Sequence, residues 1–206
     1  MAETSNPRRR AIIELARPYA RGVVVDVGCD HGHVAAALGA IGAERRSNRL
    51  PRRHDIQLVV ADGMAPFRRV DLAIIAGMGP EKILGILARG PRPEVAVVHS
   101  PQHAGSLRAG LAAAGWRIDA ERLAPENDRY ASVLRVLPGE ETATGHTLRF
   151  GPRLLEAGDP YLMKHAHQLR GWWASLAETI PAGVPKRAEA DAWVLWLDAL
   201  LQRPPA

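Results

Sequence analysis

Gly22-Val-Val-Val-Asp-Val-Gly-Cys-Asp-His-Gly-His33 joins an apolar run to an acid and then to a glycine-rich turn. The β-branched valines at 23–25 are typical of a strand that is buried on both faces. Gly28 and Gly32 permit the tight turn and the close backbone approach that a bound cofactor requires. The stretch therefore predicts a β-strand that leads directly into a nucleotide-binding loop.

The spacing inside this loop favours one class of nucleotide. Asp26, Gly28, Asp30 and Gly32 occupy every second position and give the pattern D-x-G-x-D-x-G. This pattern is closer to the E/D-x-G-x-G-x-G loop of enzymes that use S-adenosylmethionine than to the G-x-G-x-x-G loop of dinucleotide enzymes. A methyl donor is thus favoured over NAD, and a purely structural turn between strand and helix is the alternative.

The composition bounds the function classes. The 206 residues suffice for one main domain with a small appendage, and no apolar run approaches the roughly 20 residues of a membrane span. The beginning of the chain is polar, so we expect a cytoplasmic protein with no membrane partner. Cys29 is the single cysteine, which excludes an intramolecular disulfide. The histidines near the predicted loops have no carboxylate cluster beside them, and we expect no metal.

Positive charge is concentrated in the first third of the chain. The net charge is +5, and 24 of the 27 basic residues are arginines because only three are lysines. Five arginines lie close together at positions 45, 46, 49, 52 and 53. A phosphate-rich partner would account for such a cluster, and a solvated basic loop is the alternative.

Alternating apolar and turn segments predict an α/β fold. A short helix is expected over 11–16, further strands over 39–43, 57–60, 72–75 and 95–98, a helix over 104–114, and a terminal strand pair over 116–118 and 131–136. This order predicts a Rossmann-like, doubly wound sheet that is mostly parallel and ends in an antiparallel strand.

The C-terminal part has a different pattern. Residues 138–145 resemble a linker, and two long amphipathic stretches follow at 160–180 and 186–201. We expect a helical hairpin in which the tryptophans pack the helices together, with base stacking as the alternative. The predicted units are residues 1–145 and 146–206.

Several polar residues follow the predicted strands, where ligands bind in such sheets. Glu44 stands near the spacing at which an acid binds ribose hydroxyls, and Asp62 with Gly63 could bind an adenine. A solvated glutamate and a simple Asp-Gly turn are the alternatives. The next strand leads into a second glycine-rich turn, Ile75-Ala-Gly-Met-Gly79, so Gly77, Met78 and Gly79 are also predicted to line the cofactor site.

Five motifs together resemble the bacterial TrmK family of tRNA adenine-N1 methyltransferases. They are Asp26-Val-Gly-Cys-Asp-His31, Ile75-Ala-Gly-Met-Gly79, the Pro101 turn, Glu126-Asn-Asp-Arg-Tyr-Ala-Ser-Val133 and Gly151-Pro152, in that order. The resemblance implies a class I methyltransferase domain with a helical C-terminal extension, S-adenosylmethionine as cofactor and methylation of the adenine at position twenty-two of tRNA. The segment 30–44 is shorter than in the family, 45–57 lacks the family's helix, and the Q-P-N turn is replaced by Ser100-Pro101-Gln102.

This chemistry suggests catalytic candidates. N1 of a neutral adenine already carries a lone pair, so positioning should dominate, and a carboxylate would stabilise the charge that develops on the base. We expect Asp30 to supply that carboxylate, His31 and Gln102 to position the base, and the arginines at 45–53 to bind tRNA phosphates. The rival hypotheses are a methyltransferase with another substrate and a non-catalytic RNA-binding module; the oligomeric state is open, and a monomer is compatible with the sequence.

Overall fold

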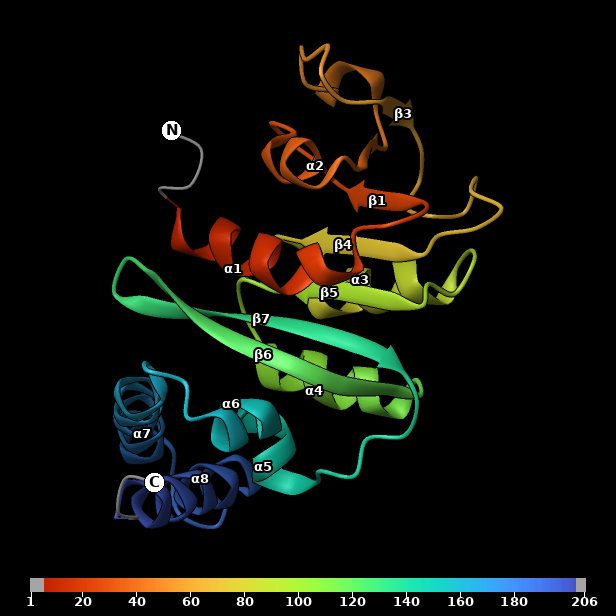
Figure 1. Ribbon diagram of the computed structural model, residues 1–206. Coiled ribbons are helices and arrows are strands. Elements are labelled where there is room, and N and C mark those ends of the chain that lie inside the picture. The colour runs from red at the N-terminus through yellow and green to blue at the C-terminus, as the bar shows by residue number, and fades with distance from the viewer. Residues whose placement is uncertain (1–5, 203–206) are drawn as a thin grey trace.

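A single mixed β-sheet forms the centre of the computed structural model, which describes residues 6–202. Within that range seven strands pair in the order β3-β2-β1-β4-β5-β7-β6 (Figure 1). Their bounds are β1 Val24–Val27, β2 Ile41–Glu44, β3 Leu58–Val60, β4 Leu72–Ala76, β5 Val95–His99, β6 Trp116–Glu126 and β7 Arg129–Pro138. The first five run parallel and β7 is antiparallel to β5, as the sequence predicts.

The terminal strand pair is longer than its sequence pattern indicates. β6 and β7 remain paired from Trp116 and Pro138 to Glu126 and Arg129. An irregularity in register between Ile118 and Ala120 interrupts the apolar alternation, so the pattern predicted only the first three residues of β6.

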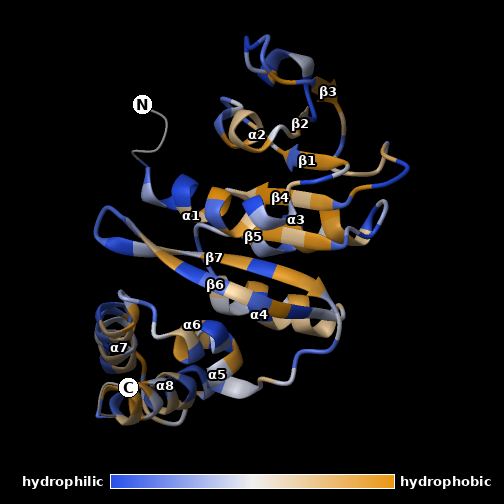
Figure 2. Ribbon diagram, viewed as in Figure 1, coloured by the Kyte–Doolittle hydropathy of each residue, from blue (hydrophilic) through white to orange (hydrophobic). Residues whose placement is uncertain are grey.

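Helices cover both faces of the sheet. The helices α1 (Pro7–Ala16) and α2 (His33–Leu38) pack on the face formed by alternate strand residues such as Val24 and Val97. On the other face α3 (Pro80–Ala88) and α4 (Ala104–Ala113) pack over alternate residues such as Val98. Figure 2 shows the central strands β1, β4 and β5 as largely hydrophobic, which is expected for strands that are covered on both faces.

The C-terminal helices lie beyond β6, at the opposite end of the sheet from β3 (Figure 1). Two short helices, α5 (Gly145–Phe150) and α6 (Pro152–Ala157), connect the sheet to the antiparallel pair α7 (Leu162–Thr179) and α8 (Pro185–Leu201). Trp173 and Trp193 stack between α7 and α8 with their ring centroids 5.5 Å apart. These two tryptophans pack the helices together as predicted, whereas Trp172 is 56% exposed.

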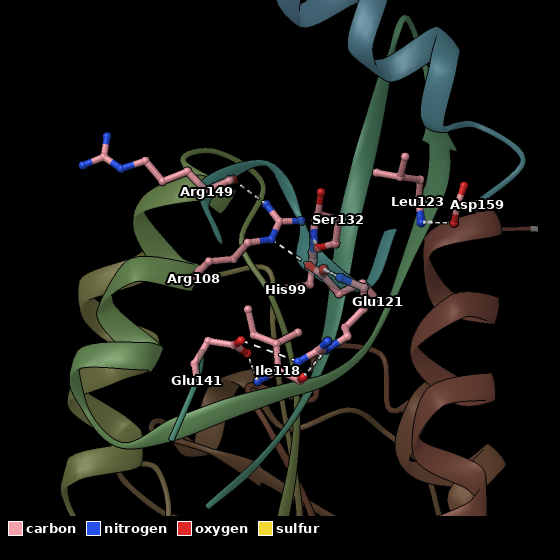
Figure 3. Close-up of polar contacts among 10 residues, drawn as sticks. His99, Arg108, Ile118, Glu121, Leu123, Ser132, Glu141, Arg149 and Asp159 are labelled. Carbon is pink, nitrogen blue, oxygen red and sulfur yellow. Dashed lines mark hydrogen bonds and ion pairs between the residues drawn. The ribbon is translucent and has the colours of Figure 1, made fainter. Parts of the chain in front are cut away.

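A buried polar network fastens this extension to the sheet. Arg108 of α4 donates to the Glu121 carboxylate of β6 at 2.6 Å and to the Arg149 carbonyl of α5 at 3.1 Å (Figure 3). The second carboxylate oxygen of Glu121 accepts from the backbone amide of Arg153 at 3.0 Å. Both side chains of the ion pair are almost fully buried, so the pair itself is shielded from water. No helix in the described part of the chain is both long and apolar enough to span a membrane.

Candidate cofactor cleft

A cleft of about 1400 Å³ opens at the carboxyl ends of the parallel strands. It lies at the switch point of the sheet, where the strand order proceeds from β1 to β2 in one direction and from β4 to β5 in the other. Ligands of doubly wound sheets bind at such a point because the loops on the two sides diverge there. Its lining comes from the loops after β1, β2, β3 and β4 and from parts of α1 and α3.

The loop after β1 has the backbone conformation that its glycines predict. Gly28 and Gly32 have φ angles of +74° and +69°, and Asp30 between them has +47°. Left-handed backbone is easy for glycine and strained for most other residues. A Cβ atom on Gly28 would also lie 2.5 Å from Cε of Met78, which comes from the turn after β4. The two predicted glycine turns therefore meet across one cleft.

Glu44, at the end of β2, holds the first loop in place. Its Oε1 accepts a hydrogen bond from the backbone amide of Asp30 at 3.1 Å. Asp62 and Gly63 follow β3 on the same wall, and Asp62 lies 4.0 Å from the guanidinium of Arg45. The predicted ribose-binding and adenine-binding residues thus share the lining of the cleft.

Asp26 is the buried acid of the site. It lies one residue before the end of β1 and is only 5% exposed. Burial raises its pKa to about 7, the hydrogen bond from the Ala35 backbone counteracts that rise, and the nearby charge of Glu44 adds to it. A carboxylate that is buried and lies near a second acid is stabilised strongly by a ligand that brings a positive charge next to it.

The second glycine turn leaves open space. Cβ atoms built on Gly77 and Gly79 would meet nothing within 4 Å, and both residues line the cleft. The Gly77 amide donates to the carbonyl of His99 at 3.0 Å, which fixes the turn to the end of β5. The turn is thus anchored at Gly77, while its cleft side leaves room for a ligand to approach the backbone closely.

Most of the predicted site residues line the cleft. They are Asp26, Gly28, Asp30, His31, Glu44, Arg45, Arg46, Arg49, Asp62, Gly63, Gly77, Met78 and Gly79. Asp30 and His31 are highly exposed at the mouth, with the His31 ring nitrogen 3.6 Å from an Asp30 oxygen.

Four predicted residues lie outside that lining. A Cβ atom on Gly32 would face Ile56 and Arg53 rather than the cleft. Arg53 pairs with Asp55 at 2.6 Å, and Arg52 is exposed on the same loop. Gln102 is exposed in the turn after β5. In residues 6–202 no cluster of three or more acidic, histidine or cysteine side chains could hold a metal ion.

Two helices contribute lining residues that the loop motifs do not indicate. The start of α1 provides Arg8, Arg9 and Ile12 together with the N-cap residue Asn6, and α3 provides Lys82 together with the residue that follows the helix, Arg89. The arginine run that begins at Arg8 was the available signal in the sequence, but only the fold shows that it borders the cleft.

The residues present fit S-adenosylmethionine. This cofactor is a cation at its sulfonium and carries ribose hydroxyls and an adenine. The cleft offers the buried acid Asp26, the carboxylates Glu44 and Asp62 at successive strand ends, and free space over Gly77 and Gly79. Acids at these places suit hydroxyl and cation recognition, and the glycines admit close contact.

Comparisons with known proteins agree with this geometry. The family model described as TrmK, tRNA (adenine(22)-N(1))-methyltransferase, matches residues 40–194, which is well over half of the chain. No curated protein sequence matches this chain significantly.

Solved structures share the fold over nearly the whole chain. A putative tRNA (m1A22) methyltransferase of Streptococcus pneumoniae superposes with a TM-score of 0.80 at 22% identity, covering 95% of this chain and 98% of the other. The B. subtilis m1A22 tRNA methyltransferase TrmK has a TM-score of 0.78 at 19% identity, with coverages of 96% and 98%. M. capricolum TrmK, in complex with S-adenosylhomocysteine, has a TM-score of 0.76 at 14% identity, with coverages of 94% and 96%. At these identities the likeness demonstrates a common fold, including the C-terminal helices.

Proposed function

The chain belongs to the TrmK family of tRNA (adenine(22)-N(1))-methyltransferases, and from this premise we propose that it methylates N1 of adenine 22 in a tRNA with S-adenosylmethionine as the donor. The observation that best supports the proposal is the meeting of two glycine turns across one cleft. The loop that holds Gly28 and the turn that holds Met78 come together at the switch point of the sheet. That is where such a fold binds its cofactor.

Each acid of the cleft has a distinct task in this proposal. S-adenosylmethionine, when bound, supplies an electrophilic methyl group. Glu44 fixes the backbone of the first loop through the Asp30 amide and accepts from ribose hydroxyls, while Asp62 and Gly63 bind the adenine edge. Asp26 provides buried negative charge beneath the loop and compensates the positive charge of the cofactor.

Positioning carries most of the rate enhancement. The N1 lone pair of adenine is already nucleophilic, and an aligned approach to the methyl group can supply roughly 7–11 kcal/mol in favourable intramolecular systems. We propose that Asp30 stabilises the positive charge that develops on the base and that His31 orients it, since both side chains lie exposed at the mouth of the cleft. Gln102 is proposed to contact the base from the outer rim.

A basic rim is proposed to hold the tRNA. Arg45, Arg46 and Arg49 border the cleft on one side, and Arg8 with Arg9 and Lys82 with Arg89 extend the basic border to α1 and α3. Arg52 and Arg53 continue the rim outside the cleft. Their guanidinium groups neutralise phosphates and release counterions.

The organisation of the chain follows from the same proposal. We assign methyl transfer to residues 1–145 and treat residues 146–206 as a helical extension. A tRNA substrate is consistent with a cytoplasmic location.

Methyl transfer to a defined tRNA tests this function. The protein would be incubated with radiolabelled S-adenosylmethionine and an unmodified tRNA transcript that carries adenosine at position 22, with a transcript carrying guanosine there as the matched control. We expect 1-methyladenosine in digests of the first transcript and no label in the second. Equal labelling of both would place the methylated position elsewhere, and cofactor binding without any labelling would refute tRNA as the substrate.

A further inference from the structure

One buried histidine beside the cleft has a ring nitrogen with no hydrogen-bond partner. His99 is the last residue of β5 and its side chain is fully buried. Its Nδ1 lies 3.0 Å from the carbonyl oxygen of Ser132 on β7 (Figure 3). A carbonyl oxygen only accepts, so Nδ1 carries the proton and Nε2 presents a bare lone pair. Nε2 is buried and unpartnered among the described residues.

The surroundings keep this ring neutral. Burial lowers the pKa of His99, and the charge of Arg8 lowers it further, whereas the contact with Ser132 and the charge of Glu126 raise it. Arg8 and Glu126 form an ion pair with each other. His99 is therefore a neutral hydrogen-bond acceptor at physiological pH. A buried acceptor without a donor is costly and calls for a physical explanation.

The position of His99 in the fold indicates which kind of group donates a hydrogen bond to its Nε2. Its backbone pairs with Ala76 in register and accepts from the Gly77 amide, so it lies directly beside the second glycine turn. By strand alternation its side chain lies on the α1 face of the sheet, with Val97 and Ile12. Arg8 and Ile12 of α1 and Ala76 of β4 line the cleft. His99 pairs with Ala76, and the charges of Arg8 and Glu126 act on its ring, so the ring lies close to this wall although it does not line the cleft.

The acids that we assign to the cofactor lie on one side of the cleft, which leaves the wall near His99 for the methyl acceptor. The cofactor-binding acids come from β1, β2 and β3, on one side of the switch point. A base that approaches the methyl group from the other side meets the turn after β4 and the first turns of α1. Adenine carries its 6-amino group, a hydrogen-bond donor, next to N1. Methylation of N1 makes the ring cationic and strengthens that donor.

We propose that Nε2 of His99 accepts a hydrogen bond from the 6-amino group of the target adenine, which enters as the Arg8–Glu126 pair gives way. This inference rests on the proposed function, because it names a substrate contact in the same site. His99 thereby positions N1 and selects adenine over bases that carry an oxygen acceptor at that place, since two acceptors cannot bond to each other.

A cycle of variants and substrates tests the contact. The His99→Phe variant and the wild type are each assayed for kcat/KM on two tRNAs, one with adenosine and one with purine riboside at position 22, which lacks only the 6-amino group. We expect His99→Phe to lower kcat/KM about ten- to hundredfold on the adenosine tRNA and much less on the purine tRNA. For each tRNA the kcat/KM of the wild type is divided by that of the variant, and the two ratios are compared. The intrinsic reactivity of each base cancels in its ratio because both enzymes act on the same substrate.

The controls separate a contact from a structural role. S-adenosylmethionine affinity should be the same in His99→Phe and the wild type, and His167→Phe, at an exposed site on α7, should match the wild type on both tRNAs. Equal losses on both tRNAs would overturn the inference while leaving the proposed function intact. If the wild type does not methylate the adenosine tRNA at all, the proposed function fails and this inference fails with it.

A second measurement needs no variant and therefore no folding control. In protein with ¹⁵N-labelled histidine and bound S-adenosylhomocysteine, Nε2 of His99 should resonate as a bare acceptor nitrogen. Addition of the adenosine tRNA should shift it towards a hydrogen-bonded value, and the purine tRNA should leave it unchanged. A hydrogen-bonded resonance before any tRNA is added would show that a buried water satisfies Nε2 and would contradict the proposal.

Discussion

Two buried carboxylates in this molecule have opposite surroundings. Glu121, at the junction between the sheet and the C-terminal helices, receives hydrogen bonds from the Arg108 guanidinium and the Arg153 amide. Asp26, beneath the cleft, has the negative charge of Glu44 nearby, and its pKa is raised to about 7. The charge of Glu121 is compensated by Arg108 within the protein, whereas the charge of Asp26 is compensated when a ligand brings a positive charge.

The difference distinguishes a structural acid from a binding acid. A buried ion pair that is held by further hydrogen bonds locks elements together, and removal of one member leaves the other charge uncompensated. In the Arg108 guanidinium, Nε and Nη1 are hydrogen-bonded, whereas Nη2 is buried without a partner among the described residues. A buried acid without a cation reduces the stability of the empty protein, and such groups are concentrated at functional sites. The same acid-to-amide substitution should therefore have opposite effects at the two positions.

The largest effect is expected at the junction. Glu121→Gln leaves the Arg108 charge buried without a counterion, and we expect the free energy of unfolding to fall by about 3–5 kcal/mol. Urea denaturation followed by circular dichroism measures the change. Glu14→Gln is the matched control, because Glu14 pairs with Arg10 at the surface and should contribute less than about 1 kcal/mol. A loss as small as that of the control would show that the junction does not depend on its ion pair.

The matching substitution in the cleft should affect binding instead. We expect Asp26→Asn to weaken the binding of S-adenosylmethionine at least tenfold, which is about 1.4 kcal/mol of binding free energy, because the buried charge that faces the cation is lost. Isothermal titration gives the dissociation constant. At pH 8 the unfolding free energy of this variant should equal or exceed that of the wild type. A destabilisation as large as that of Glu121→Gln would make Asp26 a structural acid.

The pH dependence of stability sharpens the contrast. Between about pH 4 and pH 7 the unfolded chain has already released the Asp26 proton while the folded protein retains it, since the folded pKa is about 7 against an ordinary value of 3.8. The contribution of this group to the unfolding free energy therefore falls as pH rises, by up to about 1.4 kcal/mol per pH unit.

The measurable quantity is the difference in unfolding free energy between Asp26→Asn and the wild type at pH 5 and at pH 8. The variant should gain relative to the wild type at the higher pH. A constant difference would mean that Asp26 ionises normally in the folded protein.

The smallest effect concerns the rim of the cleft. Arg46→Gln should weaken tRNA binding a few-fold. It should also reduce the slope of the logarithm of the binding constant against the logarithm of the salt concentration by about one, while cofactor affinity stays constant. Filter binding over a series of salt concentrations measures both quantities. Arg187→Gln, on α8 and paired with Asp191 away from the cleft, is the control. An unchanged salt slope for Arg46→Gln would remove this arginine from the RNA-binding surface.

Local patterns were sufficient for much of the fold and the cleft. The valines of β1 and the positive φ angles at Gly28 and Gly32 follow directly from the residue types, and the acids at the strand ends lie where parallel topology brings them together. The long helices α7 and α8 followed from their apolar periodicity.

Features that depend on distant partners were not predictable. Arg108 and Glu121 are ordinary surface residue types, and only the packing of α4 against β6 makes them a buried pair. The coverage of one cleft wall by the first turns of α1, and the burial of His99 behind it, likewise depend on tertiary packing. The extent of β6 was underestimated because its irregular register interrupts the alternation.

The most direct test of the claim that Asp26 marks the cofactor site is the proton balance of S-adenosylmethionine binding. Isothermal titration at pH 7 in buffers of different ionisation enthalpy gives the number of protons released when the cofactor binds. We predict that the wild type releases a fraction of a proton, because the cation drives Asp26 to ionise, and that Asp26→Asn releases none. Equal proton release from both proteins would show that Asp26 does not ionise when the cofactor binds and would contradict its place in the cofactor site.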